Sequence, residues 1–312
     1  MDYGTYGVPR ADLGEALQEY IDSESNYIGT TAFPITNVGV ESGKYSAIVR
    51  ETLTARATTR RGDNGAYARV GLKAEDVTFA CEENGLEHPI SEKVRKRYQS
   101  DFDAEMAGAK KIASQLMREQ EIRVADLLFD ATTWTGSDLY LDTTGTWATV
   151  TTNIIGDVET AKEKVFGNTG MEANTLIINR NTLSDILVNT AIVGRVQYAQ
   201  VATQEAVLNA LANIMGLDQI LVGKGVYNSK PEGATAFSGT PIWSNSYAMV
   251  GYVPADSDPS MPAIGRTFLW TEDSPTNMIS ESYEEVQTRS TVVRVRQNTD
   301  EKRIDPYFGF LL

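Results

Sequence analysis

The sequence predicts an α+β fold in which long strands and one very long helix accompany a smaller α/β unit. Three observations support this class. Apolar residues recur at three- and four-residue steps between about residues 91 and 130, which indicates an amphipathic helix. Short apolar runs alternate with helical patterns between residues 151 and 265, and the C-terminal region returns to alternating, strand-like sequence.

The composition is that of a globular protein without a metal or disulfide framework. Of the 312 residues, 41% are hydrophobic and 22% charged, and 28 basic against 42 acidic side chains give a net charge of −14. This charge disfavours broad binding of nucleic acid. Cys81 and His88 are single residues of their types, so neither a zinc centre nor an internal disulfide is expected. The longest uncharged stretch contains Pro241 and Pro254, so no membrane span is expected.

The N-terminal residues predict an extended arm. Glycine and proline recur up to about residue 44, and large apolar residues are too few to form a core. One helical piece over residues 12–20 interrupts the arm, with Asp12 as its expected N-cap.

Residues 46–80 predict a long, exposed β-hairpin. The Asn64-Gly65 pair supplies the positive φ angles of a tight turn, and strand-like runs rich in Thr and Arg flank it. A two-stranded hairpin with so few large apolar residues is marginal in water, so we expect its partner to be another molecule. The alternative is a merely solvated hairpin. The residues expected to contact that partner are Arg56, Arg60, Arg61, Asn64 and Arg69.

The longest periodic segment predicts one helix from Ser91 to Asp130, with Ser91 as its N-cap. At 1.5 Å per residue such a helix is roughly 55 Å long. A coiled coil is the alternative, but strand-like sequence follows and the apolar stripe drifts around the helix. We therefore expect the helix to lie along a sheet.

The rest of the chain predicts an α/β unit followed by long strands. Leu139–Thr152 is expected to form strand and turn, and the last seven residues are apolar enough that they must dock. Arg294 and Arg296 alternate with apolar residues on the last predicted strand and join the contact candidates. Three further helices are expected: one at 157–165, one whose N-cap is Asn181, and one at 204–215. The other expected strands are at 176–178, 220–222, 242–253, 267–270, 284–289 and 291–296.

Catalytic and cofactor-binding motifs are missing from the sequence. The glycines near Lys44 and Lys224 lack the spacing of a phosphate-binding loop or a dinucleotide site. Cys81 and His88 could form a nucleophile–base pair, but no active-site sequence surrounds either residue. A buried cysteine and a loop histidine are the simpler interpretation. We expect no enzymatic activity, no cofactor and no metal.

The order of these parts resembles the major capsid proteins of tailed bacteriophages, which have the Hong Kong 97-like fold. The similarity lies in the joint order of stretches at 66–70, 79–90, 102–105, 174–179, 217–224, 242–245, 253–254, 267–270 and 294–296. It implies an N-terminal arm (1–45), an extended hairpin loop (46–86), a peripheral domain with a spine helix (87–150 and 266–298) and an axial domain (151–265 and 299–312).

The resemblance implies a structural subunit that assembles through hexamers and pentamers into an icosahedral head shell. Such a shell encloses double-stranded DNA without sequence-specific binding, and it is a virion component assembled in the host cytoplasm. The expected partners are other copies of the chain, a scaffolding protein, a portal and a decoration protein. Because the sequence begins at the arm, the scaffold is expected to be separate or the chain already processed. Two alternatives stay open: an encapsulin-like nanocompartment shell protein, and a cysteine-dependent hydrolase that uses Cys81 and His88.

Overall fold

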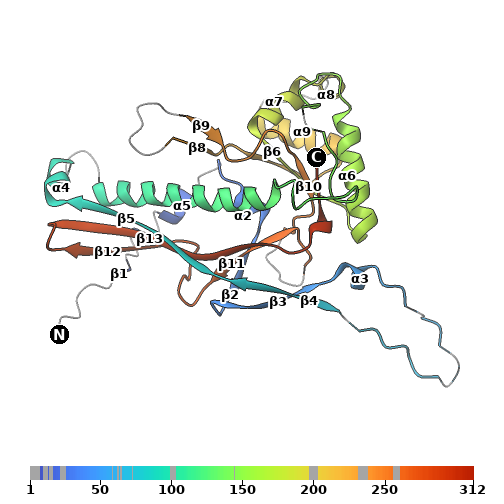
Figure 1. Cartoon of the computed structure of the whole chain (residues 1–312), viewed down its shortest axis with the longest axis horizontal. Coiled ribbons are helices and arrows are strands. Elements are labelled where there is room, and N and C mark those ends of the chain that lie inside the picture. The colour runs from blue at the N-terminus through green and yellow to red at the C-terminus, as the bar shows by residue number, and fades with distance from the viewer. Residues whose placement is uncertain are drawn as a thin grey trace.

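The computed structural model describes residues 8–9, 13, 17–21, 26–57, 59–61, 63, 65–71, 73–98, 103–143, 145–196, 203–230, 238–255 and 261–312. A long sheet covered by one helix forms one half of the molecule, and a smaller α/β unit packs at one end of it (Figure 1). A long loop leaves the body on the side of the α/β unit (Figure 1). Among the described residues, none of the helices has the length and apolarity required to cross a membrane.

One long strand, β13 (Ser290–Arg303), organises the main sheet. Along one edge it pairs with β5 over ten positions; along the other it pairs first with β12 and then with β11. Two short segments of the arm complete the sheet, β1 beside β12 and β2 parallel to β11. These strands are β1 (Val8–Pro9), β2 (Ile35–Val38), β5 (Glu82–Ser91), β11 (Gly265–Trp270) and β12 (Ile279–Glu285).

Two helices replace the single helix expected over residues 91–130. Helix α4 (Glu92–Tyr98) starts at Ser91, whose Oγ accepts the N–H of Val94 at 3.3 Å, so this N-cap is confirmed. Helix α5 (Ala104–Leu128) has an N-cap of its own, because the Asp103 carboxylate accepts two N–H groups of its first turn. The expectation of one continuous helix is therefore wrong, and α5 is about 37 Å long.

Helix α5 lies along the sheet as expected. Its buried face packs on β5 and β13 through Ile90, Ile112, Leu116, Val293 and Val295. Residues 17–21 of the arm are also helical, and Leu17 joins the same cluster. The predicted N-cap Asp12 lies outside the described residues.

A buried carboxylate joins the arm, α5 and the α/β unit. Glu121 of α5 is 1% exposed and accepts the N–H groups of Ile28 and Gly29, at the start of α2 (Gly29–Ala32), and the indole N–H of Trp243. The distances are 3.0, 2.5 and 2.5 Å. Burial raises the pKa of Glu121, and these hydrogen bonds oppose the rise.

The α/β unit is built on a four-stranded sheet in the order β14–β10–β6–β7. Strand β6 is buried along its whole length and is parallel to β7. The helices of this unit cover one face of its sheet, and α2 with the C-terminal part of α5 covers the other face. The elements are α6 (Ile154–Thr169), β6 (Thr175–Asn179), α7 (Arg180–Val188), α8 (Thr190–Val196), α9 (Gln204–Met215), β7 (Gln219–Gly223), β10 (Met249–Gly251), η1 (Pro306–Phe308) and β14 (Gly309–Leu311). A hairpin of β8 (Val226–Asn228) and β9 (Gly239–Pro241) projects beside it.

The predictions for this unit are partly confirmed. The helices at 157–165 and 204–215 are α6 and α9, and each ends at a glycine with positive φ, Gly170 and Gly216. The strands at 176–178 and 220–222 are β6 and β7. Residues 308–312 are buried, as the apolar C-terminal sequence requires.

Four predicted details are wrong. The N-cap of α7 is Asn179 rather than Asn181, because the Asn179 side chain accepts the N–H of Asn181. Only residues 249–251 of the expected strand at 242–253 pair in a sheet. The described residues of 139–152 form the expected turns, but in place of a strand they have a single β-bridge between Tyr140 and Leu311. The expected strand at 284–289 starts at Ile279 and ends at Glu285.

The buried core predicts different effects for two glycine substitutions. A Cβ at Gly223 would lie 2.0 Å from the Trp243 ring, whereas a Cβ at Gly167 in α6 would meet nothing within 4 Å. We expect Gly223→Ala to lower the free energy of unfolding by about 1–3 kcal/mol through overpacking. Gly167→Ala should leave it unchanged or raise it by about 0.5–1 kcal/mol, because alanine favours a helix interior. Urea denaturation of the two variants compares them, and equal stabilities would contradict this packing.

Candidate subunit-contact surfaces

The predicted hairpin is paired at its base only. Strand β3 (Ser42–Ile48) pairs with β4 (Ala74–Ala80), and the ladder ends at the pair Ile48–Ala74. After helix α3 (Arg50–Leu53) the described residues of 54–73, here called the basic loop, form no helix or strand. The prediction of strands on both sides of residues 61–65 is therefore wrong. Figure 1 shows this loop extending away from the body.

The basic loop is exposed and cationic. Every one of its described residues is exposed, and Tyr67 and Val70 are 76% and 71% exposed. Its sequence holds four arginines and Lys73 against one carboxylate, Asp63, in a chain with net charge −14. Its described residues form no backbone–backbone hydrogen bond between 55 and 71. The loop therefore offers both backbone groups and positive charges to a partner.

The predicted contact residues of the basic loop have different surroundings. Arg56, Arg60 and Arg69 are exposed and form no ion pair with any residue that the structure describes. Arg61 lies over the ring of Tyr67 at 4.5 Å and donates to a carbonyl of its own loop. Asn64 lies outside the described residues.

The base of the basic loop is anchored to the body. The Arg50 guanidinium lies 3.4 Å from the centre of the Tyr307 ring, and the Thr52 hydroxyl bonds to both backbone groups of Lys73 at 3.2 Å. Burial raises the pKa of Asp305 beside them, and the Arg50 charge opposes the rise. The loop thus starts from a fixed base.

Arg294 and Arg296 have partners within the chain. Arg294 binds Glu87 at 2.6 Å and Glu281 at 3.5 Å. Arg296 binds Glu281 at 3.1 Å and also Asp273. These pairs join β13 to β5 and β12, so both arginines stabilise the sheet, and their contact with a neighbouring molecule stays a prediction.

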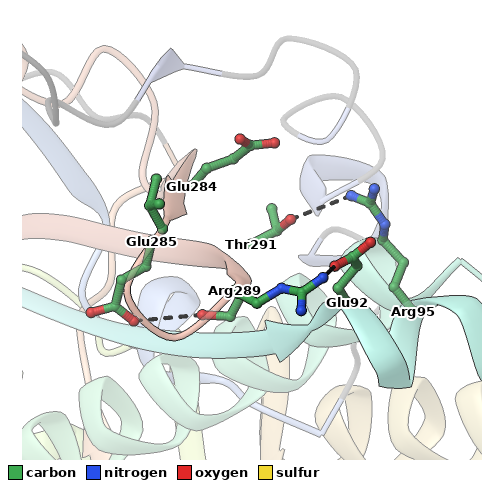
Figure 2. A pocket seen from close by; sticks show the side chains of 8 residues that line it. Glu92, Arg95, Glu284, Glu285, Arg289 and Thr291 are labelled. Atoms are coloured by element: carbon green, nitrogen blue, oxygen red, sulfur yellow. Dashed lines mark hydrogen bonds and ion pairs between the residues drawn. The ribbon is translucent and has the colours of Figure 1, made fainter.

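A second surface of mixed charge lies at the far end of the sheet, where β12 turns into β13. Figure 2 shows the tip pocket, of about 300 Å³, which is lined by Glu92, Arg95, Glu284, Glu285, Val286, Arg289, Ser290 and Thr291. Arg289 binds Glu92 at 2.8 Å across the pocket, and hydrogen bonds from Lys96 and Arg289 lower the pKa of Glu92. Val286 is 83% exposed on the turn. Sequence reasoning missed this surface because its two sides lie almost 200 residues apart.

Comparison with solved structures identifies the architecture. A phage-related protein from Bordetella bronchiseptica RB50 superposes with a TM-score of 0.74 at 20% identity, over 98% of this chain and 97% of that chain. A virus-like particle from Pyrococcus furiosus superposes with a TM-score of 0.57 at 11% identity, over 96% of this chain and 97% of that chain. The capsid structure of the cyanophage P-SCSP1u superposes with a TM-score of 0.56 at 11% identity, over 100% of this chain and 90% of that chain. The chain has the Hong Kong 97-like capsid fold. No family model matches the sequence, and no curated protein matches it significantly.

Within this capsid fold, an unpaired strand edge carries negative charge. Among the described strands β5 pairs with β13 alone, which leaves its second edge open over ten residues. Glu82, Glu83 and Glu87 are exposed on β5, and Glu87 is already bound by Arg294. The acidic residues were visible in the sequence, but the open edge became clear only with the order of the sheet.

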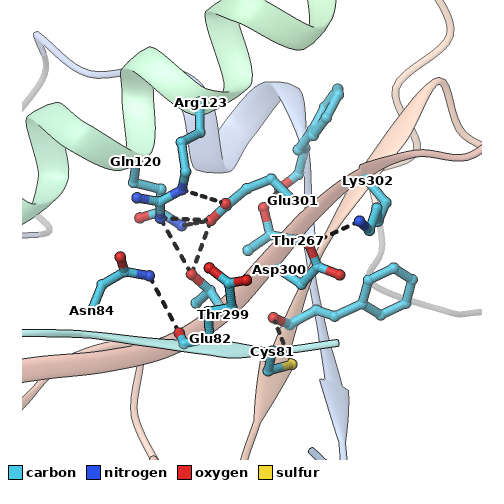
Figure 3. Close-up of polar contacts among 12 residues, drawn as sticks. Cys81, Glu82, Asn84, Gln120, Arg123, Thr267, Thr299, Asp300, Glu301 and Lys302 are labelled. Carbon is cyan, nitrogen blue, oxygen red and sulfur yellow. Dashed lines mark hydrogen bonds and ion pairs between the residues drawn. The ribbon is translucent and has the colours of Figure 1, made fainter. Parts of the chain in front are cut away.

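The capsid fold separates Cys81 from His88. Cys81 directly precedes β5 and His88 is its seventh residue, so the two lie about 23 Å apart along an extended strand. The Cys81 thiol is buried and donates to the carbonyl of Phe268 at 3.7 Å (Figure 3). Burial and the charge of Asp300 raise its pKa to about 11. The alternative of a hydrolase that uses these two residues is therefore wrong.

The polar cluster above Cys81 is structural. Arg123 of α5 binds Glu301 of β13 through two nitrogens, at 2.7 and 3.1 Å (Figure 3). Gln120 and Thr299 donate to the same carboxylate at 3.3 and 2.9 Å. The Glu301 side chain is 4% exposed, so these bonds fix α5 on the sheet. No group of three or more metal-ligating side chains occurs in the described part of the chain.

The raised pKa of Cys81 predicts slow alkylation. At pH 7.5 about one thiol in three thousand is ionised when the pKa is about 11, and only the thiolate reacts. We expect iodoacetamide to label the folded protein at least about tenfold more slowly than the urea-denatured protein, with a rate that still rises between pH 8 and pH 10. Mass spectrometry measures both rates. A rate that levels off near pH 8 would contradict the buried, protonated thiol.

Proposed function

We propose that this chain is a major capsid protein that assembles into the icosahedral head shell of a tailed double-stranded DNA bacteriophage. The observation that carries the proposal is the basic loop: a capsid-fold subunit holds out an exposed, cationic segment whose charges and backbone groups its own described residues leave largely unused. Another copy of the chain supplies the complementary groups. The role is structural, and no step of it needs a catalytic residue.

The energetics favour many weak contacts over one strong contact. A single exposed ion pair contributes about 0.2–1 kcal/mol. In a closed shell each subunit gives its basic loop to one neighbour and receives a loop from another, so the contacts act together. The open edge of β5, with Glu82 and Glu83, is the surface to which we assign the loop, because its charge is opposite and its backbone groups are unpaired.

The remaining partners follow from this role. Hexamers and pentamers of the chain form the shell, and a scaffolding protein, a portal and a decoration protein are its further partners in the virion. The net charge of −14 suits a wall that encloses DNA without sequence-specific binding. Assembly takes place in the host cytoplasm. The division into arm, extended loop, peripheral domain and axial domain, with the residue limits given above, belongs to the same proposal.

A second candidate function is an encapsulin-like compartment. The observation that favours it is the similarity to the virus-like particle from Pyrococcus furiosus, whose TM-score equals that of the cyanophage capsid within 0.01. The contents of purified particles distinguish the two functions. A cargo protein inside supports the compartment, whereas packaged DNA and attached tail components support the phage head.

Charge reversal in the basic loop tests the assembly proposal. We expect the triple variant Arg56→Glu/Arg60→Glu/Arg69→Glu to lose at least about tenfold in shell yield, because repulsion replaces attraction at every contact of the loop. Its melting temperature as a free subunit should stay within about 2 °C of the original, since exposed substitutions change stability little. Electron microscopy and sedimentation measure the yield.

The matched control replaces the same three arginines with lysine. This variant keeps every charge and should form shells with nearly the original yield. Normal assembly of the glutamate variant, or equal loss in both variants, would contradict the proposed role of these charges.

A further inference from the structure

A second pocket lies in the α/β unit, and no residue of the basic loop lines it. The Asp185 pocket has a volume of about 210 Å³ and is lined by residues 143, 145, 147–148, 182, 185, 245–248 and 312. It is next to the point where β6 ends and α7 begins, because Thr182 and Asp185 belong to the first turns of α7. The carboxyl ends of parallel strands are where α/β units most often bind ligands.

A buried hydroxyl without a hydrogen-bond partner lines this pocket, which indicates that a ligand binds there. Thr182 is 5% exposed, and its Oγ1 forms no hydrogen bond with any group in the described part of the chain. Buried polar groups are nearly always hydrogen-bonded, since the loss of water otherwise goes uncompensated. A ligand in the pocket would supply the missing partner.

One charge and two aromatic rings define the rest of the lining. Asp185 lies three residues after Thr182, so both side chains lie on the same face of α7. It is half-buried and is the single acidic or basic residue among those that line the pocket. Trp147 and Tyr247 supply the rings, and Asn245 and Ser246 supply further polar groups. The Trp147 indole N–H is already bound to Asp157 at 2.9 Å.

We propose that the Asp185 pocket binds a small organic cation through its ammonium or guanidinium group. Such a group has only donors, and it meets the Asp185 carboxylate and the free lone pairs of Thr182. The faces of the aromatic rings in the wall attract a cationic group, and they do not repel the alkyl chain that carries it. An anionic ligand would face an uncompensated carboxylate. The volume holds a group of a few heavy atoms and excludes a nucleotide.

Two sources supply this chemistry: a free alkylamine, or a lysine or arginine side chain of a neighbouring copy. The second source rests on the proposed shell function, and the first does not. The experiment therefore measures binding by the unassembled full-length subunit and, separately, the formation of shells.

The binding arm uses n-butylammonium as the probe and 1-butanol as its neutral match. In saturation-transfer NMR of the full-length chain we expect saturable binding of n-butylammonium and none of 1-butanol. Asp185→Asn and Thr182→Val should each weaken this binding, the first by about tenfold or more because a charge-assisted hydrogen bond is lost. Glu163→Gln, an exposed change on α6 outside the pocket, should leave it unchanged. Equal signals from the two probes, or unchanged binding by Asp185→Asn, would overturn the proposal.

The assembly arm identifies the source. If a neighbour's side chain occupies the pocket, Asp185→Asn should lower shell yield severalfold and n-butylammonium should inhibit assembly, while Glu163→Gln has neither effect. If the ligand is a free amine, Asp185→Asn should assemble normally and still fail to bind the probe. If the original chain forms no shells but binds n-butylammonium through Asp185, this result refutes the shell function and supports the proposed binding site.

Discussion

The buried carboxylate of Glu121 fixes how the arm and the α/β unit are placed on helix α5. Helix α2 has four residues, too few to be stable alone, and Glu121 accepts the N–H groups that its first turn leaves without partners. The same carboxylate accepts the indole N–H of Trp243, which is itself fully buried in the α/β unit. One side chain of α5 thus ties the arm and the α/β unit to the helix that covers the main sheet.

This fixed body is consistent with the proposal that the basic loop contacts a partner. Arg123 and Glu301 hold α5 on β13, and Arg294 and Arg296 hold β13 to its neighbours, so these charges are satisfied within the subunit. The basic loop has a firm base, and beyond it the residues of the loop that the structure describes form no comparable contacts with the body. In a capsid fold, a rigid body with an unsatisfied extension is suited to repeated contacts between identical copies.

Local sequence patterns predicted the elements better than their contacts. Periodicity located α5, α6 and α9 and the strands β6, β7, β11 and β13, because burial of one face imposes a repeat that a single segment displays. The break before α5 depends on one capping residue, Asp103, which the surrounding periodicity concealed. The partners of Arg294 lie about 200 residues away or across a strand pair, so no local pattern distinguished this arginine from those of the basic loop. The Asp185 pocket likewise needs four segments that lie far apart in the sequence.

Hydrogen exchange of backbone amides tests most directly whether a rigid subunit is completed by its copies. The account predicts that the amides of Ile28 and Gly29 exchange slowly in both the free subunit and the shell, because Glu121 accepts them in either state. The amides of residues 65–71 should exchange rapidly in the free subunit and become protected by about tenfold or more in the shell. Amides of residues 65–71 that exchange equally fast in both states would contradict the account.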